Sequence, residues 1–143
     1  MPYLRLTCPA LPAARRRQIA GELTDLLVEL FTPPRGPSRQ EIRSRSTVHF
    51  TSYNPDELFV GDRAASPDQP DVTAEISDWS MSQRQQARVA ASLTPVLSSI
   101  FGAESDAVNV GFHSDPPSDF AVGGTLLSHR VPAVARFAKR LLG

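Results

Sequence analysis

The chain is built from two similar halves, and this internal repeat constrains its fold more than any other feature of the sequence. Residues 19–27 (IAGELTDLL) and 89–97 (VAASLTPVL) match at their apolar positions, and both contain Leu-Thr. Residues 48–55 (VHFTSYNP) and 110–117 (VGFHSDPP) share the pattern Val-x-Phe-x-Ser-x-x-Pro, and a Val-Gly pair follows in each half. The sequence therefore predicts a single domain over 1–143, with repeats at about 2–62 and about 71–125.

Each half has the pattern of a strand, an amphipathic helix and a second strand. Opening strands are predicted at 3–7 and 72–77, and closing strands at 47–51 and 107–112. Between them, apolar residues recur at the 3.6-residue period of a helix; they are Ile19, Leu23, Leu26, Leu27 and Leu30, and then Val89, Leu93, Val96, Leu97 and Ile100. Pro95 is expected to interrupt and kink the second helix. The spacing of apolar residues at 131–142 predicts a terminal helical tail.

Two strand–helix–strand units in one sheet restrict the topology strongly. Each unit requires parallel strands and a right-handed crossover. Placed side by side, two units predict an α+β fold with a four-stranded mixed sheet and two helices on one face. The other face stays uncovered in the monomer, and we expect its apolar residues to need a partner, which predicts a homo-oligomer.

Composition excludes several classes of protein. The chain has 15 basic and 15 acidic residues, so its formal net charge is zero, without the basic excess of a nucleic-acid-binding protein. The cluster Arg15-Arg16-Arg17 is interpreted as a solvated helix face, because Glu22 and Asp25 follow on the same segment. No apolar run reaches membrane-spanning length and no secretory signal is evident. We therefore expect no nucleic-acid or membrane partner and a cytoplasmic location.

Cysteine and histidine give no sign of a disulfide framework, metal site or cofactor. The single cysteine, Cys8, has no CxxC partner and suggests a reducing compartment. The histidines, His49, His113 and His129, are scattered without the spacing of a zinc site. The chain also lacks a P-loop and a GxGxxG motif, so no cofactor is expected.

The order of short motifs gives the chain a family resemblance. Met1-Pro2 leads directly into the first strand, and the second half ends in Phe120-Ala121-Val122-Gly123-Gly124. Over roughly 2–125 the chain resembles the tautomerase superfamily. Its second half is similar to 4-oxalocrotonate tautomerase, and its doubled layout is similar to cis-3-chloroacrylic acid dehalogenase. The resemblance implies a homotrimer, a small-molecule substrate, Pro2 as the catalytic group after removal of Met1, and Phe120 as an apolar wall of the pocket.

The chemistry implied for Pro2 depends on its nitrogen. A prolyl nitrogen inside a chain has no basicity, whereas a terminal one is a secondary amine. A free α-amino group has a pKa near 8, and burial or neighbouring cations lower that pKa toward neutral pH, where a general base works best. Such an amine carries a proton between carbon and oxygen, or adds to a carbonyl. The small residue after Met1 favours removal of that methionine.

The sequence departs from the resemblance at the arginines that hold a substrate carboxylate in such enzymes. One arginine of 4-oxalocrotonate tautomerase falls on Asn109 or Thr47, and the other on Met81 or Pro12. The two arginines of the dehalogenase fall on Asp78 and Met81. The dehalogenase mechanism is therefore not expected here, and a dicarboxylate substrate is placed in question.

Arg43 and Arg45 are the candidates to replace those arginines. They lie just before the first closing strand and would point to the same side of an extended segment. His49, on that strand, is a further candidate for substrate binding. The alternative is that both arginines are solvated edge residues and that His49 is structural.

Three functions remain open from the sequence. The first is a tautomerase-like isomerase that uses Pro2 as a general base on a small carbonyl or enol acid. The second is a non-catalytic trimeric scaffold or small-molecule binder, which the missing arginines suggest. The third is a lyase or addition enzyme in which Pro2 acts as a nucleophile.

Overall fold

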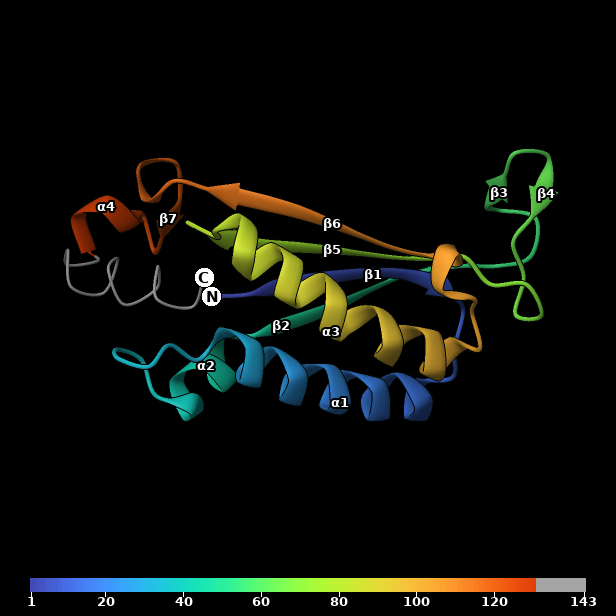
Figure 1. The fold of residues 1–143 in the computed structure, drawn as a ribbon, viewed down its shortest axis with the longest axis horizontal. Coiled ribbons are helices and arrows are strands. Elements are labelled where there is room, and N and C mark those ends of the chain that lie inside the picture. Colours follow the sequence, from blue (N-terminus) through green and yellow to red (C-terminus); the bar gives the residue numbers. More distant parts are fainter. Residues whose placement is uncertain (131–143) are drawn as a thin grey trace.

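A four-stranded sheet carries two long helices on one of its faces (Figure 1). The structure is a computed structural model that describes residues 1–130, and the helical tail predicted at 131–142 lies outside these residues. Strand order is β2-β1-β5-β6. The α+β class, the mixed four-stranded sheet and the tandem β-α-β units are thereby confirmed.

The strand directions follow from the repeat. Strand β1 (Tyr3–Pro9) pairs in parallel with β2 (Thr47–Tyr53), and β5 (Val72–Trp79) pairs in parallel with β6 (Val108–Asp115). The two units meet through β1 and β5, which are antiparallel. Each strand begins within one residue of the predicted start and ends two or three residues later.

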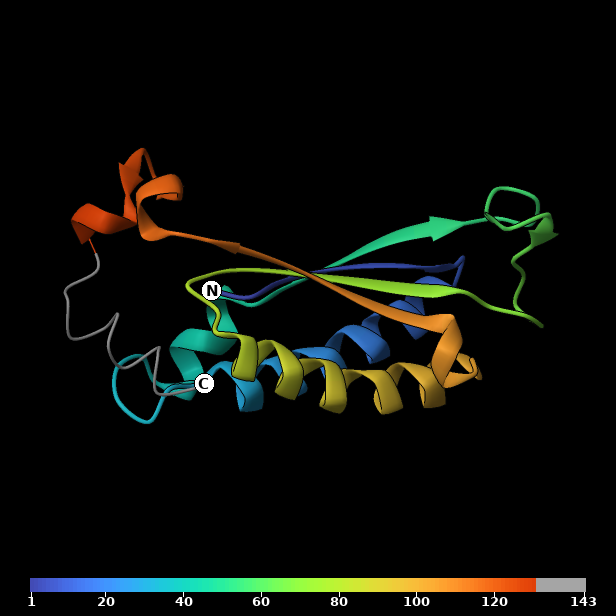
Figure 2. The same cartoon turned by 45° about the horizontal axis from the view of Figure 1, so that its top comes forward.

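Both units send their helix to the same side of the sheet (Figure 2). Helix α1 covers Ala13–Phe31 and helix α3 covers Gln83–Phe101. The predicted interruption at Pro95 is wrong, because α3 continues through it. Pro95 is exposed, so the carbonyl that loses its helical partner faces water, which can satisfy it.

The core lies between the sheet and the two helices. Alternate residues of the central strands are fully buried on this face, namely Leu4, Leu6 and Cys8 from β1 and Val72, Ala74 and Ile76 from β5. They pack with the apolar stripes of the helices, whose innermost residues are Ile19, Leu23, Leu27, Val89, Leu93 and Leu97. Burying each large side chain contributes about 1.5–3 kcal/mol, so this layer dominates the stability of the fold.

The uncovered face of the two central strands is polar, and the expectation that its apolar residues need a partner is wrong. It presents Tyr3, Arg5 and Thr7 from β1 and Thr73, Glu75 and Ser77 from β5. Arg5 Nε donates to Glu75 Oε2 at 2.9 Å across the strand pair. A partner on this face would therefore meet hydrogen-bonding groups and charges.

The linker after α1 contains a helix that the sequence analysis missed. Helix α2 spans Arg39–Arg45 and begins with a capping box between Ser38 and Glu41. Ser38 Oγ accepts from the Glu41 amide at 3.2 Å, and Glu41 Oε2 accepts from the Ser38 amide at 2.7 Å. These bonds lower the pKa of the Glu41 carboxyl. The Ser-x-x-Glu pattern was the available signal, and the extended segment expected here is wrong.

Each unit ends in a small hairpin around its Val-Gly pair. Strands β3 (Phe59–Val60) and β4 (Arg63–Ala64) form the first, and β7 (Ala121–Val122) and β8 (Thr125–Leu126) form the second. The two hairpins lie at opposite ends of the molecule (Figure 1). Helix α4 (Leu127–Arg130) follows β8, and short 3₁₀ helices cover Ser105–Ala107 and Pro117–Asp119.

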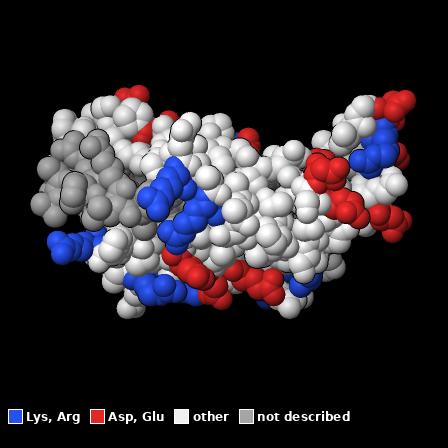
Figure 3. Space-filling view, viewed as in Figure 1, with Lys and Arg blue, Asp and Glu red and all other residues white. Residues whose placement is uncertain are grey.

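Charge on the helix-covered face is mixed. Figure 3 shows basic and acidic side chains in separate small groups over this face, without a broad field of one sign. Within residues 1–130, no helix is both long enough and apolar enough to cross a bilayer.

Candidate active site at the start of the chain

Pro2 is enclosed by the fold. It comes directly before β1, its side chain is fully buried, and its carbonyl accepts a hydrogen bond from the Thr47 amide at 3.0 Å. The β1–β5 pairing joins Tyr3 to Ser77, and one further step in that register places Pro2 opposite Asp78. Both residues then lie on the helix-covered side of the sheet, at the end where the chain starts.

Asp78 is the buried acidic group of this region. Its side chain is 2% exposed, and its Oδ1 accepts from the terminal ammonium of Met1 at 2.6 Å. The same oxygen accepts from the Trp79 amide at 2.9 Å. A buried carboxylate needs a counter-charge and hydrogen bonds, and the start of the chain supplies the charge.

The turn after Asp78 is fastened to the end of β6. The Ser80 amide donates to the Asp115 carbonyl at 3.0 Å, and the Met81 amide donates to Ser114 Oγ at 2.8 Å. Ser80 has a φ of 53°, a left-handed conformation that costs a non-glycine residue of the order of 1–2 kcal/mol. The surrounding bonds hold this strained turn and thereby fix the direction of the Asp78 side chain.

Gln85 adds an unusual polar group to this end of the fold. It lies in the first turn of α3 and is 1% exposed, and within the described residues neither its Nε2 nor its Oε1 has a hydrogen-bond partner. The first turn of α3 and the start of the chain lie close together in both Figure 1 and Figure 2. An unsatisfied buried amide costs about 1–3 kcal/mol, and a bound polar group could recover that cost.

The two candidate arginines diverge, because residues two apart on a helix face different directions. Arg45 Nη1 lies 3.8 Å from the Met1 sulfur, so this guanidinium is beside the start of the chain. Arg43 instead forms an ion pair with Asp25 of α1. Both side chains are exposed. Of the two arginines, Arg45 is the one that the structure brings to the start of the chain, through Met1.

His49 and Phe120 are placed differently. His49 lies on the uncovered face of the sheet, where its Nδ1 is 2.7 Å from the Tyr3 hydroxyl oxygen. The alternation of β1 and β2 puts it on the face opposite Pro2. Phe120 is half-buried before β7, and its carbonyl accepts from the Leu127 amide at 2.8 Å. The hairpin that it precedes lies at the same end of the molecule as the chain start (Figure 1).

Cys8 has the properties of a core residue. It is fully buried, and burial raises the pKa of its thiol to about 11 although Arg16 acts in the opposite direction. A nucleophilic cysteine needs the thiolate, which this environment disfavours. Among residues 1–130, His, Cys, Asp and Glu do not gather in a group of three or more that could bind a metal ion.

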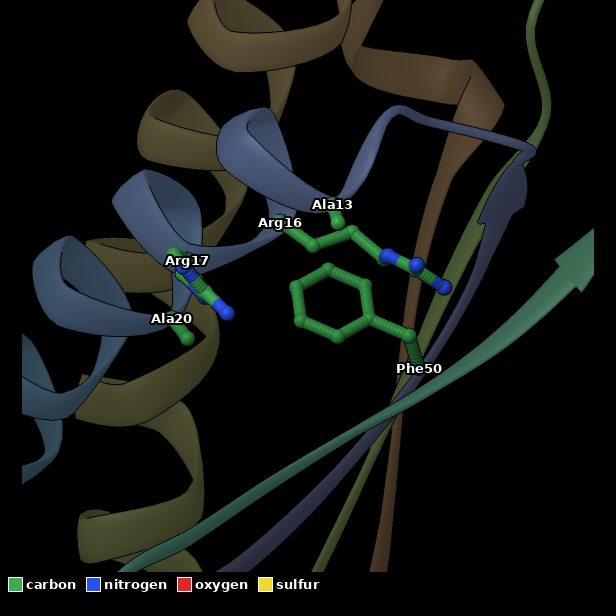
Figure 4. A pocket seen from close by; sticks show the side chains of 5 residues that line it. All are labelled: Ala13, Arg16, Arg17, Ala20 and Phe50. Carbon is green, nitrogen blue, oxygen red and sulfur yellow. The ribbon is translucent and has the colours of Figure 1, made fainter.

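A pocket lies further along the fold. The pocket in Figure 4, of about 320 Å³, is lined by Arg16, Arg17, Ala13 and Ala20 from α1 and by Phe50 from β2. Phe50 pairs in register with Leu6, four residues beyond Pro2. This pocket therefore lies apart from the start of the chain. Exposed Arg16 and Arg17 also agree with the solvated helix face predicted for the arginine cluster.

Asp78 and Gln85 are the residues of this site that sequence reasoning missed. Each leaves a signal in the apolar pattern. Asp78 follows Val72, Ala74 and Ile76 in the inward phase of β5, and Gln85 precedes Val89 by one helical repeat on α3. A polar residue in a core position of an otherwise apolar stripe is the signal that could have identified both.

Comparison with known proteins identifies the architecture. No protein-family model and no curated protein sequence matches the chain. Among solved structures, Pt0534 inactivated by 2-oxo-3-pentynoate superposes with a TM-score of 0.75 at 14% identity, over 91% of this chain and 99% of that chain. The R7 fused 4-OT, a wild-type asymmetric trimer, gives a TM-score of 0.75 at 15% identity, over 91% and 99%.

A third similar structure, N1, is described as a member of the cis-3-chloroacrylic acid dehalogenase family. It gives a TM-score of 0.66 at 19% identity, over 87% of this chain and 82% of that chain. These similarities cover nearly the whole described chain, and both β-α-β units take part in them. The chain therefore has the doubled β-α-β fold of these fused 4-OT and cis-3-chloroacrylic acid dehalogenase family structures, as its internal repeat predicted.

Proposed function

We propose that this chain, once Met1 is removed, is a small isomerase whose Pro2 amine moves a proton between carbon and oxygen of a small carbonyl or enol acid. The observation that carries the proposal is the enclosure of the chain start, where the terminal nitrogen is bonded to the buried Asp78 carboxylate at 2.6 Å. The first residues of a chain are usually poorly ordered and solvated. The bonded nitrogen belongs to Met1, and the buried Pro2 follows it directly, so removal of Met1 would place the new terminal amine at the same end of the sheet as this carboxylate.

The groups around the nitrogen suit a small acid. Arg45 brings a permanently charged guanidinium to the edge of the site, and guanidinium is well suited to binding a carboxylate. The buried Gln85 amide offers a donor and an acceptor at the same end of the fold. Phe120 is proposed as an apolar wall, whereas His49 is not part of this proposal because it lies on the opposite face.

A homotrimer is proposed as the assembly. The F6 and R7 fused 4-OT proteins are asymmetric trimers and the Q0 protein is a symmetric one, with TM-scores of 0.74, 0.75 and 0.70 to this chain. The uncovered sheet face, with Arg5 and Glu75, would supply a polar contact surface. Light scattering after size-exclusion chromatography should give three times the chain mass, and a monomer would contradict this proposal.

Mass spectrometry of the protein from its native host is the first experiment, because the proposed chemistry needs the free amine. A chain that starts at Pro2 is expected, and full retention of Met1 would end the proposal. The processed chain should then enolise phenylpyruvate, and Pro2→Ala should abolish that activity. Arg39→Gln, on the same helix as Arg45, is the matched control and should leave the activity unchanged.

A chemical probe tests the same amine without a known substrate. Because 2-oxo-3-pentynoate inactivates Pt0534, we propose it as a label for Pro2 here. The neutral nitrogen would add to the alkyne carbon that is β to the ketone. The amine proton would pass to the other alkyne carbon, next to the ketone. The mass of the labelled protein should increase by the mass of the whole reagent. Peptide mapping should locate this increase on the N-terminal peptide. Equal labelling of the Pro2→Ala chain would contradict the proposal.

The processed chain and its Pro2→Ala variant also distinguish the two other functions that the sequence left open. The non-catalytic binder is favoured by the non-arginine residues at positions such as Asn109 and Met81. Any turnover that disappears in Pro2→Ala would rule it out. A nucleophilic Pro2 would form an imine with a carbonyl compound, which borohydride would trap as a stable adduct. Turnover without trapping favours the proton-transfer function.

A further inference from the structure

We infer that Asp78 is the counter-ion of the Pro2 amine in the processed chain, so that the amine works as a proton donor to a small enol acid bound where Met1 now lies. This inference rests on the proposed function and specifies its substrate class and the partner of its amine. It follows from the positions of Met1, Asp78 and Arg45.

The Asp78 carboxylate is already in place to receive a terminal amine. It bonds the Met1 nitrogen at 2.6 Å and is held by the Trp79 amide at 2.9 Å. Pro2 is opposite Asp78 in the β1–β5 register, and directly opposite residues on one face of an antiparallel pair have Cβ atoms about 4.5–5.5 Å apart. Removal of Met1 creates the new terminal nitrogen beside a carboxylate that need not move.

The electrostatics of this end favour the charged amine. Burial alone disfavours an ammonium, but an opposite charge within about 4–6 Å favours it. Asp78 is that charge. The guanidinium of Arg45 acts the other way, yet it is exposed and therefore screened by water. Of the residues that the structure describes, Gln85 of α3 and Ser114 of β6 add neutral groups on this side, whereas alternation places Asp115 on the opposite face.

Met1 marks the space for the substrate. Its nitrogen is bonded to Asp78, its sulfur lies 3.8 Å from Arg45 Nη1, and its side chain is 26% exposed. The methionine thus bridges the buried carboxylate and the exposed guanidinium. Its removal would free the amine and vacate this space in one step. A thioether is only a weak acceptor, so a substrate carboxylate in its place would bind Arg45 far better.

The proton transfer balances with these groups alone. The Pro2 ammonium gives its proton to the enol carbon, while the electron pair of the enol C=C forms the new C–H bond. The enol hydroxyl becomes a carbonyl, and its proton passes to the now neutral amine. The Asp78 carboxylate takes no part in the transfer and stabilises the ammonium at the beginning and at the end. The enol form is therefore the form that the resting site is prepared to receive.

The test measures the pH titration of the Pro2 amine directly, in the full chain without Met1. Of the 13 prolines, only the terminal one has a nitrogen that titrates, so proline labelled with ¹⁵N reports Pro2 alone. In the folded protein the midpoint of this titration should lie at least about one pH unit above that of the same chain unfolded in urea. A folded midpoint at or below the unfolded one would overturn the inference, with no variant needed.

Substitution then assigns the effect to Asp78. Asp78→Asn should lower the folded midpoint by about 1–3 pH units. Asp106→Asn removes an exposed carboxylate at the far end of β6 and should leave the midpoint unchanged. Labelling by 2-oxo-3-pentynoate needs the neutral amine, so its rate should rise at lower pH in Asp78→Asn. An unchanged midpoint and labelling profile in a folded Asp78→Asn protein would overturn the assignment.

The titration separates this inference from the proposed function. A raised midpoint in a protein without isomerase activity would support the ion pair and contradict the function. Isomerase activity that depends on Pro2, with a midpoint that is not raised, would leave the function standing and overturn the inference.

Discussion

The terminal nitrogen of Met1 lies 2.6 Å from Asp78 Oδ1, although 77 positions separate the two residues in the sequence. This ion pair fastens the start of the first β-α-β unit to the end of the opening strand of the second. It is mostly enclosed, because the Asp78 side chain is 2% exposed. The start of the chain is therefore part of the packed structure.

An N-terminal extension should destabilise the protein. A Gly-Ser dipeptide placed before Met1 turns the terminal ammonium into a peptide amide and removes that charge from the buried Asp78 carboxylate, which costs about 3 kcal/mol when a buried pair is broken. Urea unfolding followed by circular dichroism measures the loss. The same dipeptide after Gly143 is the control and should change little. Equal stability of the two proteins would show that the pair contributes nothing.

Arg45→Ala should weaken substrate binding more than turnover. A hydrogen bond to a charged group contributes about 1.5–3 kcal/mol, so KM for an acidic substrate should rise at least about tenfold while kcat changes less. Steady-state kinetics with the processed chain gives both constants. Arg39→Gln serves again as the control on α2. A variant with unchanged KM would remove Arg45 from the site.

Gln85→Met should stabilise the protein. Methionine has a similar length and leaves no buried amide unsatisfied, so the free energy of unfolding should increase by about 1 kcal/mol. Gln86→Met, on the neighbouring half-buried position, is the matched control and should have a smaller effect. Urea denaturation measures both. A loss of stability in Gln85→Met would mean that the amide has partners in solution.

Two glycine substitutions should have opposite effects. Gly21 lies within α1 with open space around it, so Gly21→Ala should raise stability by about 0.5–1 kcal/mol. Gly102 ends α3 with a φ of 65°, so Gly102→Ala should lower stability by about 1–2 kcal/mol although no atom blocks the new methyl group. Thermal unfolding of the two variants gives the comparison. Changes of the same sign would contradict the assigned helix boundaries.

The Cys8 thiol should react slowly with thiol reagents at pH 8. Burial raises its pKa to about 11, so the folded protein contains little thiolate there. The same reagent should react rapidly after unfolding in urea, when the thiol returns to an ordinary pKa. In the folded state the rate should increase as the pH rises toward 11, because the thiolate forms only in that range. Fast reaction of folded protein at pH 8 would contradict the buried position.

The repeat and its apolar periodicity were enough to predict the sheet, the two helices and their common face. The errors arose where tertiary context outweighed a local rule. Pro95 lies on the solvent side of α3, so the helix tolerates it. The uncovered face proved polar because Arg5 and Glu75 alternate with the buried residues of their strands. The alternation of apolar and polar residues that predicted the buried face of these strands therefore also predicted a polar opposite face.

The candidate site was only partly predictable, because its main pair joins residues distant in sequence. Met1-Pro2 identified the nitrogen, but the contact with Asp78 depends on the antiparallel register between β1 and β5. The choice between Arg43 and Arg45 depended on α2, whose capping box at Ser38 was overlooked. The Met1-Pro2 motif identifies the amine, whereas the side chains beside it depend on the pairing of β1 with β5 and on the position of α2.

The doubling of the chain has a consequence for the number of reactive centres. Helix α1 begins at Ala13 and α3 at Gln83, and the same spacing matches Pro2 to Val72, a buried residue of β5 whose nitrogen belongs to a peptide bond. Two β-α-β units therefore share one amine, and a ring of three chains would contain three centres for six units. The first unit begins with the chain's terminal amine, and the second unit contributes the carboxylate that meets it. The two units are therefore alike in fold and different in the groups that they bring to this end of the sheet.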